Sequence, residues 1–195
     1  MTFFSRPLPR RDFVAASTLA VAGLALGCSR RSDAAPVPAP GGKVAIVEFD
    51  DNGKRLRTVR VDRVVKPDSA WKRQLPPLSY QVTRHEGTER AFTGPLLGEH
   101  RKGVFRCLCC DTALYDSATK FESGTGWPSF TKPLVPQNVT VKTDRTLGMV
   151  RTEVRSAHAD SHLGHLFDDG PKPTGLRYCM NSAALRFAPA TGAAA

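Results

Sequence analysis

The sequence predicts a mainly β domain built from antiparallel sheets. Short apolar runs separated by turn residues follow one another from Gly103 to Phe187. Helical patterns are confined to residues 68–83, and no alternation of strands with helices is present, so a parallel sheet is not expected. The chain of 195 residues is long enough for one ordinary domain with its own core, and it contains no internal repeat.

The first 27 residues indicate an export signal. Arg10 and Arg11 precede an apolar run from Phe13 to Gly27, which is short for a membrane span. We therefore expect export by the twin-arginine route and a location in the periplasm. A short transmembrane anchor is the alternative.

The residues after this run allow two kinds of cleavage. Leu24–Cys28 is similar to a lipoprotein signal-peptidase site, which would place lipid on Cys28 and anchor the protein to the membrane. An ordinary cut near Ala34 and Ala35 is the alternative. Residues 28–42, rich in Pro and Ala, then form a tether, and residues 189–195 form a disordered tail.

The formal net charge is +10, but lysine and arginine are spread among many acidic residues without a dense basic run. A mildly basic, solvated surface follows from this pattern. Together with the predicted export, it excludes nucleic acid as an expected partner.

Residues 43–66 predict an N-terminal β-hairpin. Apolar residues alternate with polar ones on both sides of Asp50–Gly53, and Asn-Gly is a favoured hairpin turn. A flap that packs on the following domain, residues 67–188, is the expected role.

The elements of that domain follow from local patterns. Asp68 is placed to cap a short helix that Pro76 ends, and one or two further helical turns are expected over residues 78–83. Strands are then predicted at Val104–Phe105, Val139–Val141, Met149–Val154, His162–Phe167, Leu176–Met180 and Ala184–Phe187.

Two segments carry residues suited to thiol chemistry. His162 and His165 lie three residues apart before an acidic Gly-Pro turn, and Cys179 follows Arg177. Only the thiolate is a good nucleophile, and a nearby cation lowers the pKa of a thiol. A buried structural cysteine beside core histidines is the alternative interpretation.

The second segment is the glycine-rich stretch Lys120–Phe130, which contains Trp127. Together the segments resemble the B-type peptide-methionine (R)-S-oxide reductases. The resemblance runs from about Trp71 to Phe187 and rests on Val82–Arg84, Gly87–Arg90, Gly103–Phe105, Gly124–Phe130, His162–His165 and Arg177–Ser182. It implies two antiparallel sheets with small flanking helices, and reduction of methionine-R-sulfoxide in proteins, a repair of oxidative damage.

The resemblance also implies catalytic roles. Cys179 would attack the sulfoxide sulfur and become a sulfenic acid. His165 would protonate the departing oxygen while His162 orients the sulfoxide. Asp169 would hold a histidine in the useful tautomer, and Arg177 would stabilise the thiolate.

Three further residues are expected to contact the substrate. Trp127 would pack against its S-methyl group, and Asn181 would hydrogen-bond it or an ordering water. Phe167 is the third residue expected to bind the substrate. A catalytically inactive module that captures oxidised peptides is a rival interpretation, against which the intact Cys179, His162 and His165 argue.

We expect no zinc. Cys107 and Cys110 form one C-x-x-C pair, but Ser156 and Ala159 stand where many family members supply the second pair. His158 and Asp160 could substitute only weakly. A thiol–disulfide oxidoreductase that uses Cys107 and Cys110 is a second rival interpretation, although a thioredoxin-like context is missing.

Recycling of Cys179 has two possible routes. Many relatives carry a resolving cysteine where this chain has Thr125. Either a thiol of the cluster Cys107, Cys109 and Cys110 resolves the sulfenic acid, with Cys109 favoured, or an external reductant does so directly. A thioredoxin-like protein is the expected final donor.

Overall fold

The computed structural model describes residues 41–145 and 150–192. The predicted export signal, Cys28 and almost all of the tether lie outside the described residues. The described elements are β1 (Lys43–Phe49), β2 (Arg55–Asp62), α1 (Asp68–Gln74), α2 (Pro77–His85), β3 (Gly103–Cys107), β4 (Ala113–Asp116), β5 (Lys120–Phe121), β6 (Ser129–Phe130), β7 (Val139–Asp144), β8 (Arg151–Ser156), β9 (His162–Phe167), β10 (Arg177–Met180) and β11 (Leu185–Pro189), with short 3-10 turns that include η4 (Ser182–Ala184).

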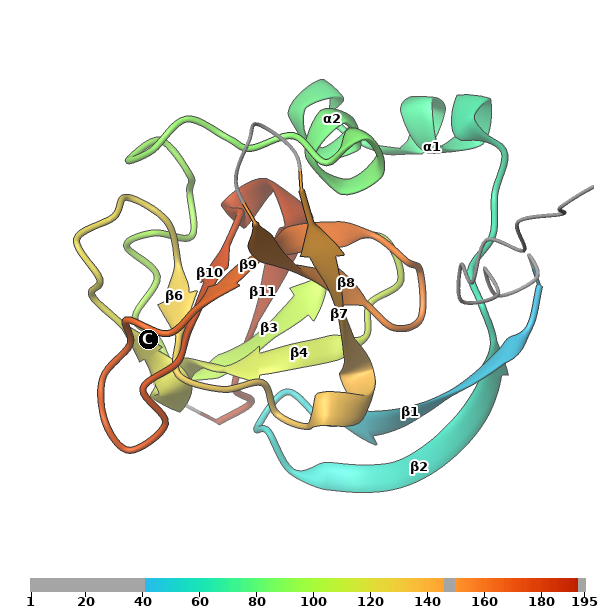
Figure 1. Cartoon of the computed structure of the whole chain (residues 1–195). Coiled ribbons are helices and arrows are strands. Elements are labelled where there is room, and N and C mark those ends of the chain that lie inside the picture. The colour runs from blue at the N-terminus through green and yellow to red at the C-terminus, as the bar shows by residue number, and fades with distance from the viewer. Residues whose placement is uncertain (1–40, 146–149, 193–195) are drawn as a thin grey trace, which may run out of the picture. The chain divides into compact units, whose positions relative to one another are not determined.

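The described strands form three sheets in which the neighbouring strands pair antiparallel. The largest has the order β5-β6-β10-β9-β8-β7, the second has the order β11-β3-β4, and β1 and β2 form a separate hairpin. In Figure 1 the two helices lie together at the top and the hairpin runs along the bottom. The predicted mainly β fold with small flanking helices is confirmed.

The core lies between the two larger sheets. Phe105 packs edge-on against Phe130, which stacks on Tyr115 with ring centroids 4.4 Å apart. The Tyr115 hydroxyl donates to the Met180 sulfur at 3.2 Å. Burying side chains of this size contributes about 2–3 kcal/mol each, so the inner face of β10 is firmly packed.

The hairpin prediction is confirmed, and the hairpin is an integral part of the fold. Val47 and Phe49 of β1 pack against Val104 and Ala113. The buried Asn138 amide accepts from the Val47 N–H and donates to the Val47 and Ala113 carbonyls, each at 2.8 Å. These contacts connect β1 to the sheet of β3 and β4 and to the 3-10 turn Pro136–Asn138 that precedes β7.

Two details of the helices differ from prediction. Pro67, not Asp68, is the residue before α1, and the Asp68 carboxylate instead accepts a hydrogen bond of 2.6 Å from the Tyr80 hydroxyl. Helix α2 is longer than predicted because Pro77 is compatible with a first helical turn and the helix ends only at the left-handed residue Glu86. No helix in the described ranges has the length and apolarity to cross a bilayer.

Candidate active site

The strand register places the motif residues in one row across the largest sheet. Cys179 on β10 lies opposite His165 on β9 and Ser129 on β6. His165 in turn lies opposite Glu153 on β8. Directly opposite residues of antiparallel strands share a face of the sheet and lie within side-chain contact, so the thiol and the imidazole are neighbours.

A cavity of about 110 Å³ lies over this row. It is lined by Thr88, Trp127, Gly164, His165, Phe167, Cys179, Met180 and Asn181. The structure therefore brings together five of the predicted site residues: Cys179, His165, Trp127, Phe167 and Asn181. His162, Asp169 and Arg177 do not line the cavity but contact groups around it.

The environment of Cys179 has opposing effects on its thiol. Burial raises the pKa of the thiol, while Arg177, Thr125 and Ser129 each lower it, and burial prevails. The Thr125 hydroxyl lies 3.9 Å from the sulfur. The predicted influence of Arg177 has the right direction, but the resting thiol is protonated at neutral pH.

Asp169 holds Arg177, not a histidine. Both carboxylate oxygens of Asp169 accept from the guanidinium, each at 2.8 Å, and the guanidinium carbon lies 4.2 Å from the centroid of the Phe167 ring. The prediction that Asp169 fixes a histidine tautomer is wrong. Asp169 lies in the turn between β9 and β10, and its carboxylate pairs with Arg177, the first residue of β10. Hydrogen bonding to Arg177 lowers the pKa of Asp169.

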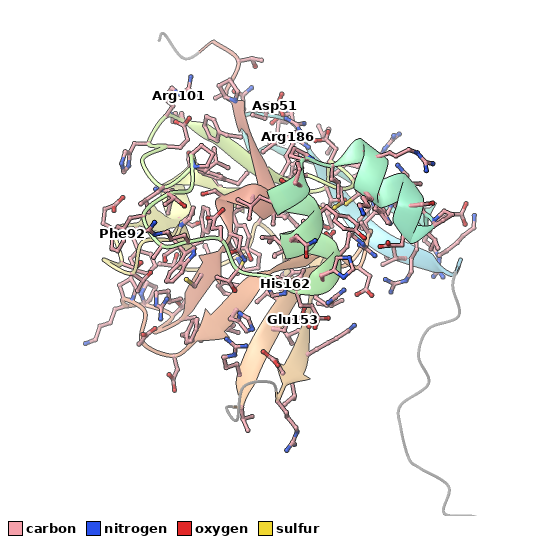
Figure 2. All side chains as sticks on the ribbon, turned by 90° about the horizontal axis from the view of Figure 1, so that it is seen from above. Asp51, Phe92, Arg101, Glu153, His162 and Arg186 are labelled. Carbon is pink, nitrogen blue, oxygen red and sulfur yellow. The ribbon has the colours of Figure 1, made fainter. Side chains whose placement is uncertain are left out.

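Other carboxylates orient the two histidines. His165 Nε2 lies 3.0 Å from an Asp144 oxygen, and His162 Nδ1 lies 2.7 Å from a Glu153 oxygen. Figure 2 shows His162 and Glu153 side by side. Burial lowers the pKa of His165, and the hydrogen bond with Asp144 opposes this only in part, so His165 is neutral at pH 7.

The amide of Asn181 is largely used within the protein. Its Oδ1 accepts from the Glu89 N–H at 3.0 Å, and its Nδ2 donates to the Leu163 carbonyl at 3.1 Å. One N–H of the amide is left for a substrate or a water. Trp127 is oriented by the same loop, because its Nε1 donates to the Glu89 carbonyl at 3.1 Å.

The thiols of Cys107, Cys109 and Cys110 lie outside this cavity. Cys107 contacts Ser161 at 3.2 Å, and Cys110 contacts Ser156 at 3.4 Å. Ser156 is two strands and three residues away from Cys179, which is about 14 Å at ordinary sheet spacings. A disulfide needs Cα atoms within about 7 Å, so the residue of β8 that contacts Cys110 lies well beyond disulfide range of Cys179.

Within the cluster, Cys109 has the more acidic thiol. A hydrogen bond with Cys107 lowers the pKa of Cys109 to about 7, although burial acts in the opposite direction. The side chain is only 5% exposed. The lowered pKa of Cys109 therefore favours its predicted role as the resolving thiol, whereas its burial and its position outside the cavity do not.

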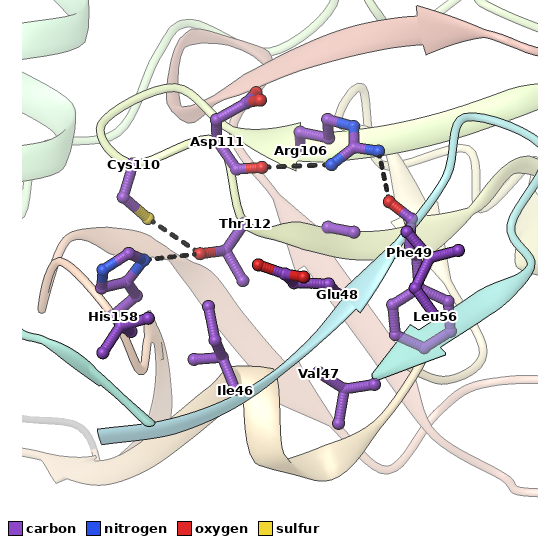
Figure 3. Close-up of a pocket in the computed structure, with 12 residues that line it drawn as sticks. Ile46, Val47, Glu48, Phe49, Leu56, Arg106, Cys110, Asp111, Thr112 and His158 are labelled. Atoms are coloured by element: carbon purple, nitrogen blue, oxygen red, sulfur yellow. Dashed lines mark hydrogen bonds between the residues drawn. The ribbon is translucent and has the colours of Figure 1, made fainter. Parts of the chain in front are cut away.

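A second cavity of about 330 Å³ separates the hairpin from the loop that carries Cys110. Figure 3 shows Cys110 and His158 both directed at the Thr112 hydroxyl, with contacts of 3.3 and 3.0 Å. His158 Nε2 also lies 3.2 Å from the Asp62 carbonyl. The ring of His158 is thus engaged in hydrogen bonds on both sides.

The residues present do not fit a structural zinc site. The Ser156 hydroxyl contacts the Cys110 thiol, and Ala159 is buried in the core. Over the parts of the chain that the structure describes, no three His, Cys, Asp or Glu side chains are arranged to hold a metal ion. A four-ligand site therefore lacks its second half.

The residues of this site lie within a part of the chain that is similar to known proteins. A family model described as "SelR domain" matches residues 75–189, which include the cavity and its surrounding strands. The chain belongs to this family. The resemblance to the B-type methionine sulfoxide reductases is thereby confirmed.

Individual relatives match over nearly their whole length. A protein of Herminiimonas arsenicoxydans, named peptide methionine sulfoxide reductase MsrB, is 52% identical over 126 residues, covering 65% of this chain and 92% of the relative. Proteins of the same name from Thiobacillus denitrificans and Pseudomonas putida are 53% and 50% identical, covering 64% and 68% of this chain and 94% and 100% of the relatives. Residues 43–66 lie outside the matched family range.

Proposed function

We propose that this protein is a peptide-methionine (R)-S-oxide reductase that uses Cys179 as its nucleophile. The observation that carries the proposal is the pairing of Cys179 with His165 beneath a cavity with aromatic walls. The names and high identity of the SelR relatives support the same activity.

The cavity suits a methionine sulfoxide side chain. Trp127 and Phe167 offer apolar surface for the S-methyl group, and His165 lies next to Cys179 in the lining of the cavity. The sulfoxide oxygen would then face the imidazole. This orientation distinguishes the two epimers, because exchanging oxygen and methyl places the polar group against the aromatic walls.

The resting protonation states fit the reaction. A protonated Cys179 and a neutral His165 hold the same number of protons as a thiolate with an imidazolium. His165 takes the thiol proton as the sulfur attacks and then delivers it to the sulfoxide oxygen. In the net step the oxygen moves to Cys179 as a sulfenic acid, the thiol is oxidised by two electrons, and the sulfoxide is reduced to methionine.

Arg177 supports this step from outside the cavity. Its charge lowers the pKa of Cys179, and the two hydrogen bonds from Asp169 fix its position. Asp169 therefore acts on the thiol through Arg177. His162 is 1% exposed and is held by Glu153, so its role is to support the row that carries His165.

For recycling, we favour direct attack on the Cys179 sulfenic acid by an external thiol. The distance between Cys179 and the cluster of Cys107, Cys109 and Cys110 supports this route over internal resolution, and a protein of thioredoxin type is the proposed donor. Water leaves when the donor thiol forms a mixed disulfide with Cys179, and a second donor thiol releases the enzyme.

Location and metal content are part of the same proposal. Residues 1–27 support twin-arginine export to the periplasm, with lipid on Cys28 as the membrane anchor and Ala34–Ala35 cleavage as the alternative. The lack of ligands at Ser156 and Ala159 supports a zinc-free enzyme.

Trapping the first intermediate tests this mechanism. Reduced enzyme treated with one equivalent of methionine-R-sulfoxide peptide, without reductant, should release one equivalent of methionine peptide. Mass spectrometry after dimedone labelling should then find the label on Cys179. A disulfide between Cys179 and Cys107, Cys109 or Cys110 would instead show internal resolution.

A further inference from the structure

We propose that Glu89 is a positioning residue for the reductase reaction. Its side chain holds the loop of residues 87–94 against the chain that follows Cys179, and the backbone of Glu89 orients Trp127 and Asn181. This inference rests on the proposed function and adds to it the residue that shapes the substrate cavity.

The carboxylate of Glu89 anchors the loop. One oxygen accepts from the Ser182 N–H at 2.6 Å and the other accepts from the Ala183 N–H at 2.8 Å. These N–H groups belong to the first turn of η4, where no intrahelical acceptor exists. Hydrogen bonds from amides to a carboxylate are strong, and Glu89 is only 2% exposed.

The backbone of Glu89 forms hydrogen bonds with two side chains that line the cavity, those of Asn181 and Trp127. The Glu89 N–H donates to Asn181 Oδ1 at 3.0 Å, and the Glu89 carbonyl accepts from Trp127 Nε1 at 3.1 Å. Trp127 and Asn181 both line the cavity above Cys179. Glu89 therefore connects the aromatic wall of the cavity with the strand end that carries the nucleophile.

Gly94, at the end of this loop, shows how closely the loop approaches Ser182 and the Glu89 carboxylate. A Cβ atom on Gly94 would overlap the Ser182 hydroxyl and would lie 2.5 Å from a Glu89 carboxylate oxygen. The Phe92 N–H also donates to the Gly126 carbonyl at 2.8 Å. The loop is thus fixed against η4 and against the segment that precedes Trp127.

Removing the carboxylate should loosen the cavity wall without changing the thiol itself. Thr125, Ser129 and Arg177 lower the pKa of Cys179, and their hydrogen bonds are made with groups other than Glu89. We therefore expect poorer substrate capture and orientation together with an unchanged intrinsic reactivity of Cys179.

The test compares Glu89→Ala and Glu89→Gln with the wild-type enzyme. A methionine-R-sulfoxide peptide is reduced with dithiothreitol, and kcat and KM are measured separately. Glu89→Ala should lower kcat/KM by about tenfold or more, because small misplacements of positioning groups have effects of this size. Glu89→Gln keeps one acceptor oxygen and should be intermediate. The rate at which iodoacetamide alkylates Cys179, followed by peptide mapping, should not change.

A matched control separates positioning from a general loss of stability. Asn138→Ala removes three buried hydrogen bonds far from the cavity and should lower Tm without changing kcat/KM. The proposal is overturned if Glu89→Ala keeps wild-type kcat/KM, or if Asn138→Ala lowers kcat/KM equally for the same loss of Tm. If Glu89→Ala does not fold, Glu89→Gln is the test variant, and a wild-type kcat/KM in Glu89→Gln would overturn the proposal.

Fluorescence gives a readout that does not depend on the activity. The chain has two tryptophans, and Trp71 is buried with no hydrogen-bond partner for its Nε1 among the described residues. In a Trp71→Phe background, the emission of Trp127 should shift to longer wavelength in Glu89→Ala. An unchanged emission would refute the positioning of Trp127 by Glu89, even if the wild-type enzyme reduced no sulfoxide.

Discussion

Cys179 and His165, which lie opposite each other on β10 and β9, share one proton in the proposed mechanism. Burial raises the pKa of the thiol and lowers the pKa of the imidazole. Both shifts favour the uncharged forms of the thiol and the imidazole. In the proposed mechanism, the proton needed for the sulfoxide oxygen is therefore held on the Cys179 thiol, and His165 transfers it.

The pH dependence of the first step follows from these directions. Below the pKa of His165, which lies under the usual value of about 6.5, the pair carries one proton too many. Above the pKa of Cys179, which lies over the usual value of about 8.5, no proton remains for the oxygen. Single-turnover methionine formation should therefore be flat across neutral pH and fall on both sides.

Arg177→Leu provides the control for this profile. Removing the charge that lowers the pKa of Cys179 should move the alkaline limb to higher pH. A rate that rises steadily through pH 8–9 (roughly the range of a free thiol), with no alkaline decline, would contradict transfer of the thiol proton through His165.

At the scale of the element, the pairing of β9 with β10 creates the site. Gly164 lies opposite Met180 in this pairing and lines the cavity. A Cβ atom on Gly164 would overlap the Cys179 carbonyl and would lie 2.9 Å from the Met180 Cα. The two strands therefore approach too closely for any side chain at this position.

Gly164→Ala should separate β9 from β10. We expect a lower Tm and a loss of activity of about tenfold or more, because Cys179 and His165 no longer lie opposite each other. Gly98→Ala is the matched control, since a Cβ atom there meets nothing within 4 Å. Equal activity of the two variants, measured with the same peptide sulfoxide, would show that the close approach is not required.

The elements also show what the sequence could predict. The strands predicted from the alternation in residues 43–62 and from the segment His162–Phe167 are confirmed, because these segments are long enough to show a pattern. Strands β5 and β6 have two residues each, and β4 has four. Such short segments carry no periodic pattern, so they follow only from tertiary pairing.

The same limit applies to the site. The nucleophile and histidines stand in recognisable motifs, but the carboxylates that orient the histidines do not. Glu153 and Asp144 lie on β8 and β7, and only the strand register brings them to His162 and His165. Asp169 is only four residues from His165 in the sequence, and this proximity suggested it wrongly as the carboxylate that orients a histidine. Alternation on the facing strand was the signal that could have identified Glu153.

In the whole molecule, one fold contains the cavity over Cys179 and, apart from it, the cluster of Cys107, Cys109 and Cys110. The hairpin β1–β2 covers the second cavity beside Cys110. The hydroxyls of Ser156 and Ser161 contact the thiols of Cys110 and Cys107. Hydrogen bonds with these serine hydroxyls therefore help to hold the cysteine cluster in place.

Metal content tests this view of the cluster. Purified protein should contain much less than one zinc per chain, and treatment with a chelator should leave Tm and activity unchanged. Near-stoichiometric zinc in elemental analysis, lost together with stability on chelation, would refute it and would indicate His158 or Asp160 as the additional ligands.

Turnover of the two epimers of dabsylated methionine sulfoxide with dithiothreitol is the most direct test that Cys179 is the nucleophile of an R-specific reductase. The R epimer should be reduced, the S epimer should not, and Cys179→Ser should abolish the reaction, because an alcohol cannot replace the thiolate. Equal reduction of both epimers would contradict R specificity. A rate above about a tenth of wild type in Cys179→Ser would contradict the role of Cys179, because only another nucleophile could then act.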